Sequence, residues 1–192
     1  MNINRILILG STYLTELVVD ELKDNNFNLV GYVPNAVRST VMGNVKLDQT
    51  TLDCDYDIAL SIQYDSLIKS NLKTFNLHTG LLPEFGGLDI LRHTLKEKRR
   101  EQGLTFHRMT DEYDYGSIVS KITYPVLLND NETSLYKRQC LIAPFFVVSC
   151  LRLIERLTPE DISECVIKKP RLLEREYKKN PIDLKELHNG CH

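Results

Sequence analysis

An asparagine and a histidine stand one residue apart in the otherwise apolar start of the segment FNLHTGLLPEFGGLD, residues 75–89. Successive side chains of a β-strand point to opposite faces, so Asn76 and His78 would project together while Leu77 points the other way. In open α/β sheets, ligands bind at the carboxyl ends of the strands. The pair therefore has two interpretations: polar groups that act on a ligand in a cleft, or a hydrogen-bonded buried pair that ties down the following loop.

Two further segments follow this pair along the chain. They are Gly103-Leu104-Thr105-Phe106-His107 and Asp114-Tyr115-Gly116-Ser117-Ile118-Val119. Together with Asn76-Leu77-His78-Thr79-Gly80-Leu81-Leu82-Pro83, they resemble the signature of the folate-dependent formyltransferases: an N-x-H-x-S-L-L-P strand and loop, then G-x-T, then D-x-G. The resemblance covers roughly residues 4–157.

The resemblance implies a reaction and a role for three residues. In this family an amine attacks the formyl carbon of 10-formyltetrahydrofolate through a tetrahedral oxyanion. Asn76 and a cationic His78 would donate hydrogen bonds to that oxyanion, and one such amide is worth about 10²–10³-fold in rate. Asp114 would raise the pKa of His78 and relay the proton that leaves the amine, through water. Taken alone, the D-x-G composition favours an ordinary turn aspartate.

The same resemblance implies where the folate binds. The family holds the pterin ring largely with backbone groups of two loops, which fall here on Tyr64, Asp65, Ser66 and Leu67 and on Asp111, Glu112 and Tyr113. His107 lies on a predicted strand and is expected to be structural. The cysteines and histidines show no zinc-site spacing, so no metal is expected.

Three branches of the family differ in the amine that they formylate. Methionyl-tRNA formyltransferases carry an additional C-terminal domain and need positive surface for tRNA, which a slightly acidic chain of 192 residues does not suggest. Phosphoribosylglycinamide formyltransferases bind a phosphate in a loop after the first strand, where this chain retains Gly10 and Ser11. Sugar N-formyltransferases tend to carry S-x-Q-Y and LPEY, which Ser61-Ile62-Gln63-Tyr64 and LPEF match. We expect a nucleotide-linked amino sugar as the acceptor, with the ribonucleotide as the alternative.

The expected substrate contacts lie in two glycine-containing loops and one helix: Gly10, Ser11, Gly86, Gly87 and His93. The chain departs from the family at Gly86, where Arg or Lys is usual, and it has no Trp, although many sugar enzymes place one soon after this loop. His93 or Arg92 would supply a replacement contact. These departures bear on the identity of the substrate more than on the reaction.

Two other classes of function compete with this interpretation. A relative that has lost activity would still hold folate or a partner protein, although it would have no physical reason to keep Asn76, His78 and Asp114 together. A nicotinamide-dependent oxidoreductase would need a glycine-rich fingerprint after the first strand, and Gly10 stands there without the rest of G-x-G-x-x-G.

The pattern of apolar residues predicts a doubly wound α/β domain, with a mostly parallel sheet and antiparallel strands late in the chain. Strands are predicted at 6–9, 29–33, 58–62, 74–78, 104–109 and 118–126, and an edge strand at 41–47. Helices are predicted after Thr12 or Ser11, at 90–98 and at 132–157, the last with a kink at Pro144. The run KEKRRE, residues 96–101, is expected to be a solvated helix end. Residues 1–157 form the predicted catalytic domain and 158–192 a short C-terminal extension.

Composition and cysteine usage predict a soluble protein of a reducing, cytoplasmic compartment. Hydrophobic residues make up 42% of the chain and charged residues 26%, with a net charge of −2. The five cysteines form no C-x-x-C pair and are expected to be free thiols. No run approaches the ~20 apolar residues of a membrane span, and no basic face predicts nucleic-acid binding. The oligomeric state stays open, with a homodimer among the alternatives.

Overall fold

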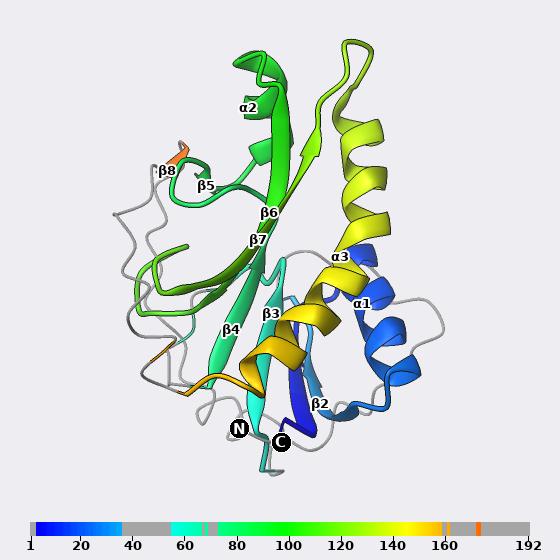
Figure 1. Cartoon of the computed structure of the whole chain (residues 1–192), viewed down its shortest axis with the longest axis vertical. Coiled ribbons are helices and arrows are strands. Elements are labelled where there is room, and N and C mark those ends of the chain that lie inside the picture. The colour runs from blue at the N-terminus through cyan, green and yellow to red at the C-terminus, as the bar shows by residue number, and fades with distance from the viewer. Residues whose placement is uncertain are drawn as a thin grey trace.

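Six strands form one mixed sheet, and two very short strands pair beside it. The computed structural model describes residues 3–35, 55–66, 68, 73–158, 161 and 172–173. The sheet order is β2-β1-β3-β4-β6-β7, and β5 pairs with β8 (Figure 1). The strands are β1 Arg5–Leu9, β2 Asn28–Val33, β3 Ile58–Ile62, β4 Thr74–His78, β5 Gly86–Gly87, β6 Glu101–Arg108, β7 Ile118–Pro125 and β8 Leu172–Leu173. The helices are α1 Tyr13–Asp24, α2 Ile90–Lys96 and α3 Glu132–Ile154.

The first four strands of the sheet are parallel, and the later ones are not. β1 lies between β2 and β3, and β3 pairs with β4, all in parallel register. β6 runs antiparallel to both β4 and β7. Apart from Arg5, every residue of β1 and β3 is buried, as expected for parallel strands covered on both faces. The arrangement confirms the predicted α/β class, mostly parallel with late antiparallel strands.

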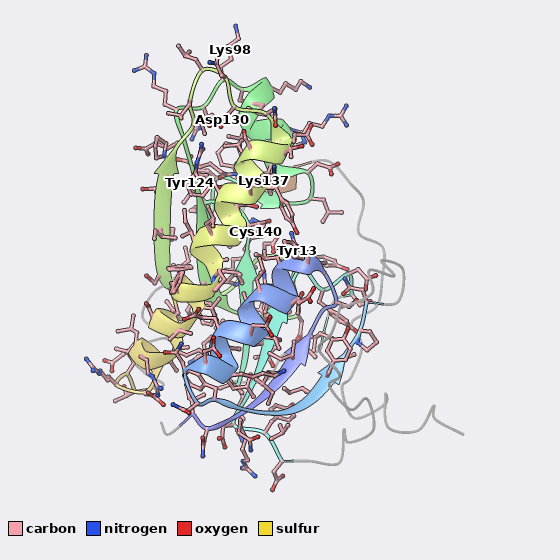
Figure 2. All side chains as sticks on the ribbon, turned by 90° about the vertical axis from the view of Figure 1, so that its right-hand side faces the viewer. Tyr13, Lys98, Tyr124, Asp130, Lys137 and Cys140 are labelled. Atoms are coloured by element: carbon pink, nitrogen blue, oxygen red, sulfur yellow. The ribbon has the colours of Figure 1, made fainter. Side chains whose placement is uncertain are left out.

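α1 and α3 pack side by side on one face of the sheet (Figures 1 and 2). Figure 2 shows Tyr13, at the start of α1, beside the turn of α3 that carries Cys140. The main core cluster joins apolar residues of both helices to those of the sheet, among them Leu14, Val18, Leu22, Val147, Cys150 and Leu151. Leu14, Val18 and Leu22 follow one another at four-residue intervals, and Val147 is followed three and four residues later by Cys150 and Leu151, as expected for one face of a helix. Among the described residues, no helix combines the length and apolarity that crossing a bilayer requires.

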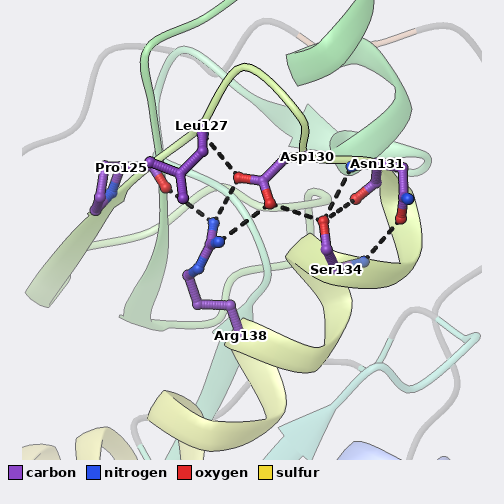
Figure 3. Close-up of polar contacts among 6 residues, drawn as sticks. All are labelled: Pro125, Leu127, Asp130, Asn131, Ser134 and Arg138. Atoms are coloured by element: carbon purple, nitrogen blue, oxygen red, sulfur yellow. Dashed lines mark hydrogen bonds and ion pairs between the residues drawn. The ribbon is translucent and has the colours of Figure 1, made fainter.

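Side chains around Asp130 fix the start of α3 (Figure 3). Asn131 caps the helix, because its side chain accepts the Ser134 N–H at 2.9 Å and its own N–H donates to the Ser134 hydroxyl at 2.9 Å. Asp130 accepts two hydrogen bonds from the Arg138 guanidinium, at 2.8 and 3.1 Å, and one from the Leu127 N–H at 2.7 Å. The Arg138 hydrogen bonds hold the pKa of Asp130 well below its usual range. The connection from β7 is thereby tied to the helix that follows it.

Element bounds differ from the expected ones where long-range pairing decides them. Glu101 does not belong to a solvated helix end: α2 ends at Lys96, and Glu101 starts β6 opposite Pro125 of β7. α3 continues through Pro144 and ends at Ile154 rather than at residue 157. The expected edge strand at 41–47 lies outside the described residues. So does most of the predicted extension 158–192, of which β8 pairs with β5.

Candidate active site

A cavity of about 290 Å³ opens at the carboxyl ends of β3 and β4. Ligand pockets usually range from about 300 to 1,000 Å³, so its size is just below that range. Its lining comes from these strand ends, from the loop and helix after β4, from the β6–β7 turn and from α3. The carboxyl edge of an open α/β sheet is the usual place for a ligand, and Asn76, His78 and Asp114 all line this cavity.

The Asn76 amide is held by His107 of the neighbouring strand. The two residues lie opposite each other in the β4–β6 register, with Asn76 Nδ2 3.1 Å from His107 Nε2. His107 Nδ1 lies 2.9 Å from the Arg108 carbonyl oxygen, so Nδ1 carries the proton and Nε2 accepts from Asn76. Burial lowers the pKa of His107 to about 4, which keeps the ring neutral. One N–H of the amide is thus fixed, and the second is left for a group in the cavity.

His78 and Asp114 form a buried ion pair. His78 Nδ1 lies 3.3 Å from Asp114 Oδ1, and the Gly87 N–H donates to Asp114 Oδ2 at 2.6 Å. Burial alone would lower the pKa of His78, but the Asp114 carboxylate and the Phe85 carbonyl, 2.6 Å from Nε2, raise it above its ordinary value. Burial would raise the pKa of Asp114, but the charge of His78 and the Gly87 N–H lower it to about 2. Both shifts favour the charged forms of the pair, an imidazolium beside a carboxylate.

Thr105, the threonine of the G-x-T segment, anchors the loop that follows β4. Its hydroxyl donates to the Gly80 carbonyl at 2.7 Å and accepts the Leu82 N–H at 3.0 Å. Thr105 stands opposite His78 in the β4–β6 register. The motif therefore fixes the loop directly behind the ion pair.

Gly116, the glycine of the D-x-G segment, allows the β6–β7 turn to approach β6. Its φ is +144°, and a Cβ at this position would lie 1.9 Å from the Arg108 carbonyl oxygen. A larger residue would force the turn away from the strand. Because Asp114 lies two residues earlier in the same turn, Gly116 also sets where its carboxylate is placed.

Some of the predicted folate contacts line the cavity, namely Tyr64, Asp65 and Tyr113. The Ser66 hydroxyl is buried and donates to Asp65 Oδ1 at 3.3 Å. Asp111 and Glu112 are exposed and lie outside the cavity lining, and Leu67 is not among the described residues. The folate contacts stay a prediction, now centred on the ends of β3 and of the β6–β7 turn.

The predicted substrate contacts divide in the same way: Gly87 lines the cavity, whereas Gly10, Ser11, Gly86 and His93 do not. The Ser11 hydroxyl is buried and accepts the Asn35 N–H at 3.0 Å. On α2 the cavity is lined by Arg92 rather than by the adjacent His93. These contacts stay predictions.

α3 supplies a wall of the cavity that the sequence analysis missed. Glu132, Tyr136 and Gln139 line it, spaced four and three residues apart on one helix face. Gln139 is 1% exposed, and its Nε2 donates to the Thr79 carbonyl at 3.1 Å. A glutamine fully buried among apolar residues of a helix is the signal that could have revealed this wall, since buried polar groups are hydrogen-bonded.

Residues 61–144 match the family model described as formyl transferase, a range that includes Asn76, His78 and Asp114. This match confirms the family resemblance. A methionyl-tRNA formyltransferase from Chlorobium phaeovibrioides is 36% identical over 109 residues, covering 56% of this chain and 34% of that protein. The chain spans 16%, 34% and 27% of the length of the first three curated relatives that it matches.

Solved structures of two formyltransferases have a similar fold. One is the N-formyltransferase from Helicobacter canadensis in complex with folinic acid and dTDP-3-aminofucose, with a TM-score of 0.65, 17% identity, and coverage of 95% of this chain and 72% of that one. The other is a phosphoribosylglycinamide formyltransferase from Brucella melitensis, with a TM-score of 0.66, 19% identity, and coverage of 82% and 98%. At such identities the likeness shows the fold alone.

Proposed function

We propose that this chain, with its formyl transferase match over residues 61–144, transfers a formyl group from 10-formyltetrahydrofolate to the primary amine of a nucleotide-linked amino sugar. The observation that carries the proposal is the meeting of Asn76, His78 and Asp114 in one cavity. A fixed amide and an imidazolium side by side suit the negative oxygen that develops when an amine attacks a formyl carbon.

The lining fits a flat, polar donor. Tyr64 and Tyr113 border the cavity with aromatic side chains, next to the polar strand ends that carry Asn76 and His78. 10-Formyltetrahydrofolate would supply the activated formyl group, and solved relatives were captured with folinic acid or tetrahydrofolic acid. These features support the folate donor as part of the proposal.

Each residue of the triad has a separate task. The free N–H of Asn76 stabilises the oxyanion while its other N–H stays on His107. His78 adds positive charge, and its Nε2 proton reaches the oxyanion only if it leaves the Phe85 carbonyl. Asp114 favours the protonated form of His78 and relays a proton through water: the amine loses it as the new C–N bond forms, and the departing folate nitrogen gains it as the old C–N bond breaks.

Two observations favour the sugar over the ribonucleotide as acceptor. The Helicobacter canadensis relative holds a dTDP-linked amino sugar. The start of α1, where the ribonucleotide branch was expected to bind a phosphate, already has a side-chain cap, because the Thr12 side chain accepts the Thr15 N–H at 3.3 Å. The second candidate, phosphoribosylglycinamide formylation, is favoured by size, since this chain covers 98% of the Brucella melitensis enzyme.

The test is release of tetrahydrofolate from 10-formyltetrahydrofolate, followed spectroscopically. dTDP-linked 3- and 4-amino sugars and glycinamide ribonucleotide serve as separate acceptors, for the wild type and His78→Ala. We expect turnover with a sugar and a loss of at least about 10²-fold in the variant, with folding checked by circular dichroism. Turnover only with the ribonucleotide would establish the second candidate. Full activity of His78→Ala would refute the mechanism.

A further inference from the structure

The cavity is lined by far more negative than positive charge. Its carboxylates are Asp65, Asp89, Asp114 and Glu132, and the one Lys or Arg among the described lining residues is Arg92. His78 pairs with Asp114, which leaves three other acidic residues in the lining against Arg92. Such a lining repels an anion, although both proposed substrates carry anionic groups: the folate has glutamate carboxylates, and the acceptor has phosphates. An anionic substrate therefore needs a specific cation here.

Arg92 is available for that task. Its side chain is exposed on α2, and within the described part of the chain it makes no ion pair or hydrogen bond. Four other arginines are already paired with carboxylates: Arg5, Arg99, Arg138 and Arg152. A guanidinium without a partner binds an anion without first breaking another ion pair, and its planar fork matches the oxygens of a phosphate or a carboxylate.

The other obvious anion site, the start of α1, is occupied by the protein's own side chains. The Thr12 N–H donates to the Thr15 hydroxyl at 3.2 Å, and the Thr15 N–H donates to Thr12. The groups that a phosphate would need at this helix start are thus largely used.

We propose that Arg92 binds an anionic group of a substrate at the cavity and so determines which substrate is accepted. This inference rests on the proposed function. In either case the guanidinium would donate two hydrogen bonds to a pair of anionic oxygens. These oxygens belong either to the phosphates of the nucleotide-linked acceptor or to the glutamate carboxylates of the folate. Arg92 does not touch the reacting atoms in this scheme, so it affects binding rather than the chemical step.

The experiment compares Arg92→Gln and Arg92→Lys with the wild type. Arg100→Gln is the matched control, because it removes the same charge from an arginine that is also exposed and lies outside the cavity lining. We expect Arg92→Gln to raise the KM of one substrate by about 10- to 100-fold while kcat changes less than about threefold. Arg92→Lys should recover part of the loss. A rise in the acceptor KM identifies the phosphates, and a rise in the folate KM identifies the carboxylates.

Calorimetry with dTDP and with folinic acid separates this proposal from the proposed function, because binding needs no turnover. If Arg92→Gln weakens one of these ligands and Arg100→Gln does not, the anion site stands even where no acceptor is formylated. If Arg92→Gln and Arg100→Gln bind both ligands as tightly as the wild type, the role of Arg92 is refuted while the formyl transfer is not. Failure of the wild type to bind either ligand would overturn both.

Discussion

Replacing Asp114 with asparagine tests the central ion pair, because the side chain keeps its shape and loses its charge. The two charges lie 3.3 Å apart. At an effective dielectric constant of about 20, their attraction is about 5 kcal/mol, comparable to the several kcal/mol that burying one ion costs. In the wild type this attraction favours the protonated form of His78 and so raises its pKa. In Asp114→Asn only the Phe85 carbonyl still opposes the effect of burial, so the pKa of His78 should fall well below its value in the wild type.

The predicted consequence is a slower enzyme with a shifted pH profile. At neutral pH we expect kcat to fall by about 10²- to 10⁴-fold, the usual range for a lost acid–base group. In the wild type the pKa of His78 is raised, so activity should decline only as pH rises through that raised value, above the ordinary 6.5. In the variant the decline should begin at lower pH. The direction of this shift separates loss of the His78 charge from a merely damaged site.

Tetrahydrofolate release measured from about pH 5.5 to 9 gives this profile. Carbon-detected NMR of the imidazole rings gives the pKa of His78 directly, since the chain has only 5 histidines. If the His78 pKa and the alkaline limb are the same in both proteins, the ion pair does not hold the charge and the reasoning fails.

The same pair makes a stability prediction with a definite sign. Its contribution is present above the unfolded-state pKa of Asp114, 3.8, and lost as pH falls towards its folded pKa of about 2. It is also lost as pH rises through the raised pKa of His78. Urea unfolding should therefore show the largest destabilisation of Asp114→Asn, about 3–5 kcal/mol, between about pH 4 and 6.5.

Substitutions at three further positions test the supporting structure. His107→Leu should lower kcat by about tenfold, because the Asn76 amide loses its acceptor, whereas His107→Gln should retain most activity; equal rates for both would contradict the positioning role. Gly116→Ala should lower the unfolding midpoint in a thermal scan by roughly 2–12 °C, since its Cβ would meet the Arg108 carbonyl, and an unchanged midpoint would show that the turn gives way freely. Asp130→Ala should lower the unfolding midpoint without changing the folate KM, and a change confined to that KM would instead link the α3 cap to the site.

The strands, the helices and the catalytic motifs could be predicted, because each depends on a short stretch of sequence. The periodicity of apolar residues located all six strands of the main sheet and the three helices, and the N-x-H, G-x-T and D-x-G segments located the triad. Gly116 shows why such a motif is readable: its conformation leaves room for glycine alone. The motifs did not locate the residues that contact the substrate in the same way, because Gly87 alone among the predicted substrate contacts lines the cavity.

Features set by long-range register could not be predicted. The partnership of Asn76 with His107 depends on how β6 aligns with β4, which no local pattern encodes. Glu101 carries a charge and belongs to a basic run, yet pairing with β7 places it in a strand. Gln139 joins the site only because α3 crosses near the end of β4, where its amide meets the Thr79 carbonyl.

The distance along the chain between the parts of this cavity bears on how the protein acquires its activity. The lining begins at Gln63 and is complete only with Gln139, and β4 must pair with β6 across the intervening loop and helix. Closing such long loops costs entropy before any contact repays it, so non-local sheets fold slowly. A refolding chain can hold Asn76 and His78 on a formed strand before His107 reaches Asn76 and before Gln139 reaches the Thr79 carbonyl. The ability to bind substrates and to catalyse transfer is therefore expected to arise late in folding. A ligand that binds only the fully folded state would shift the folding equilibrium towards that state.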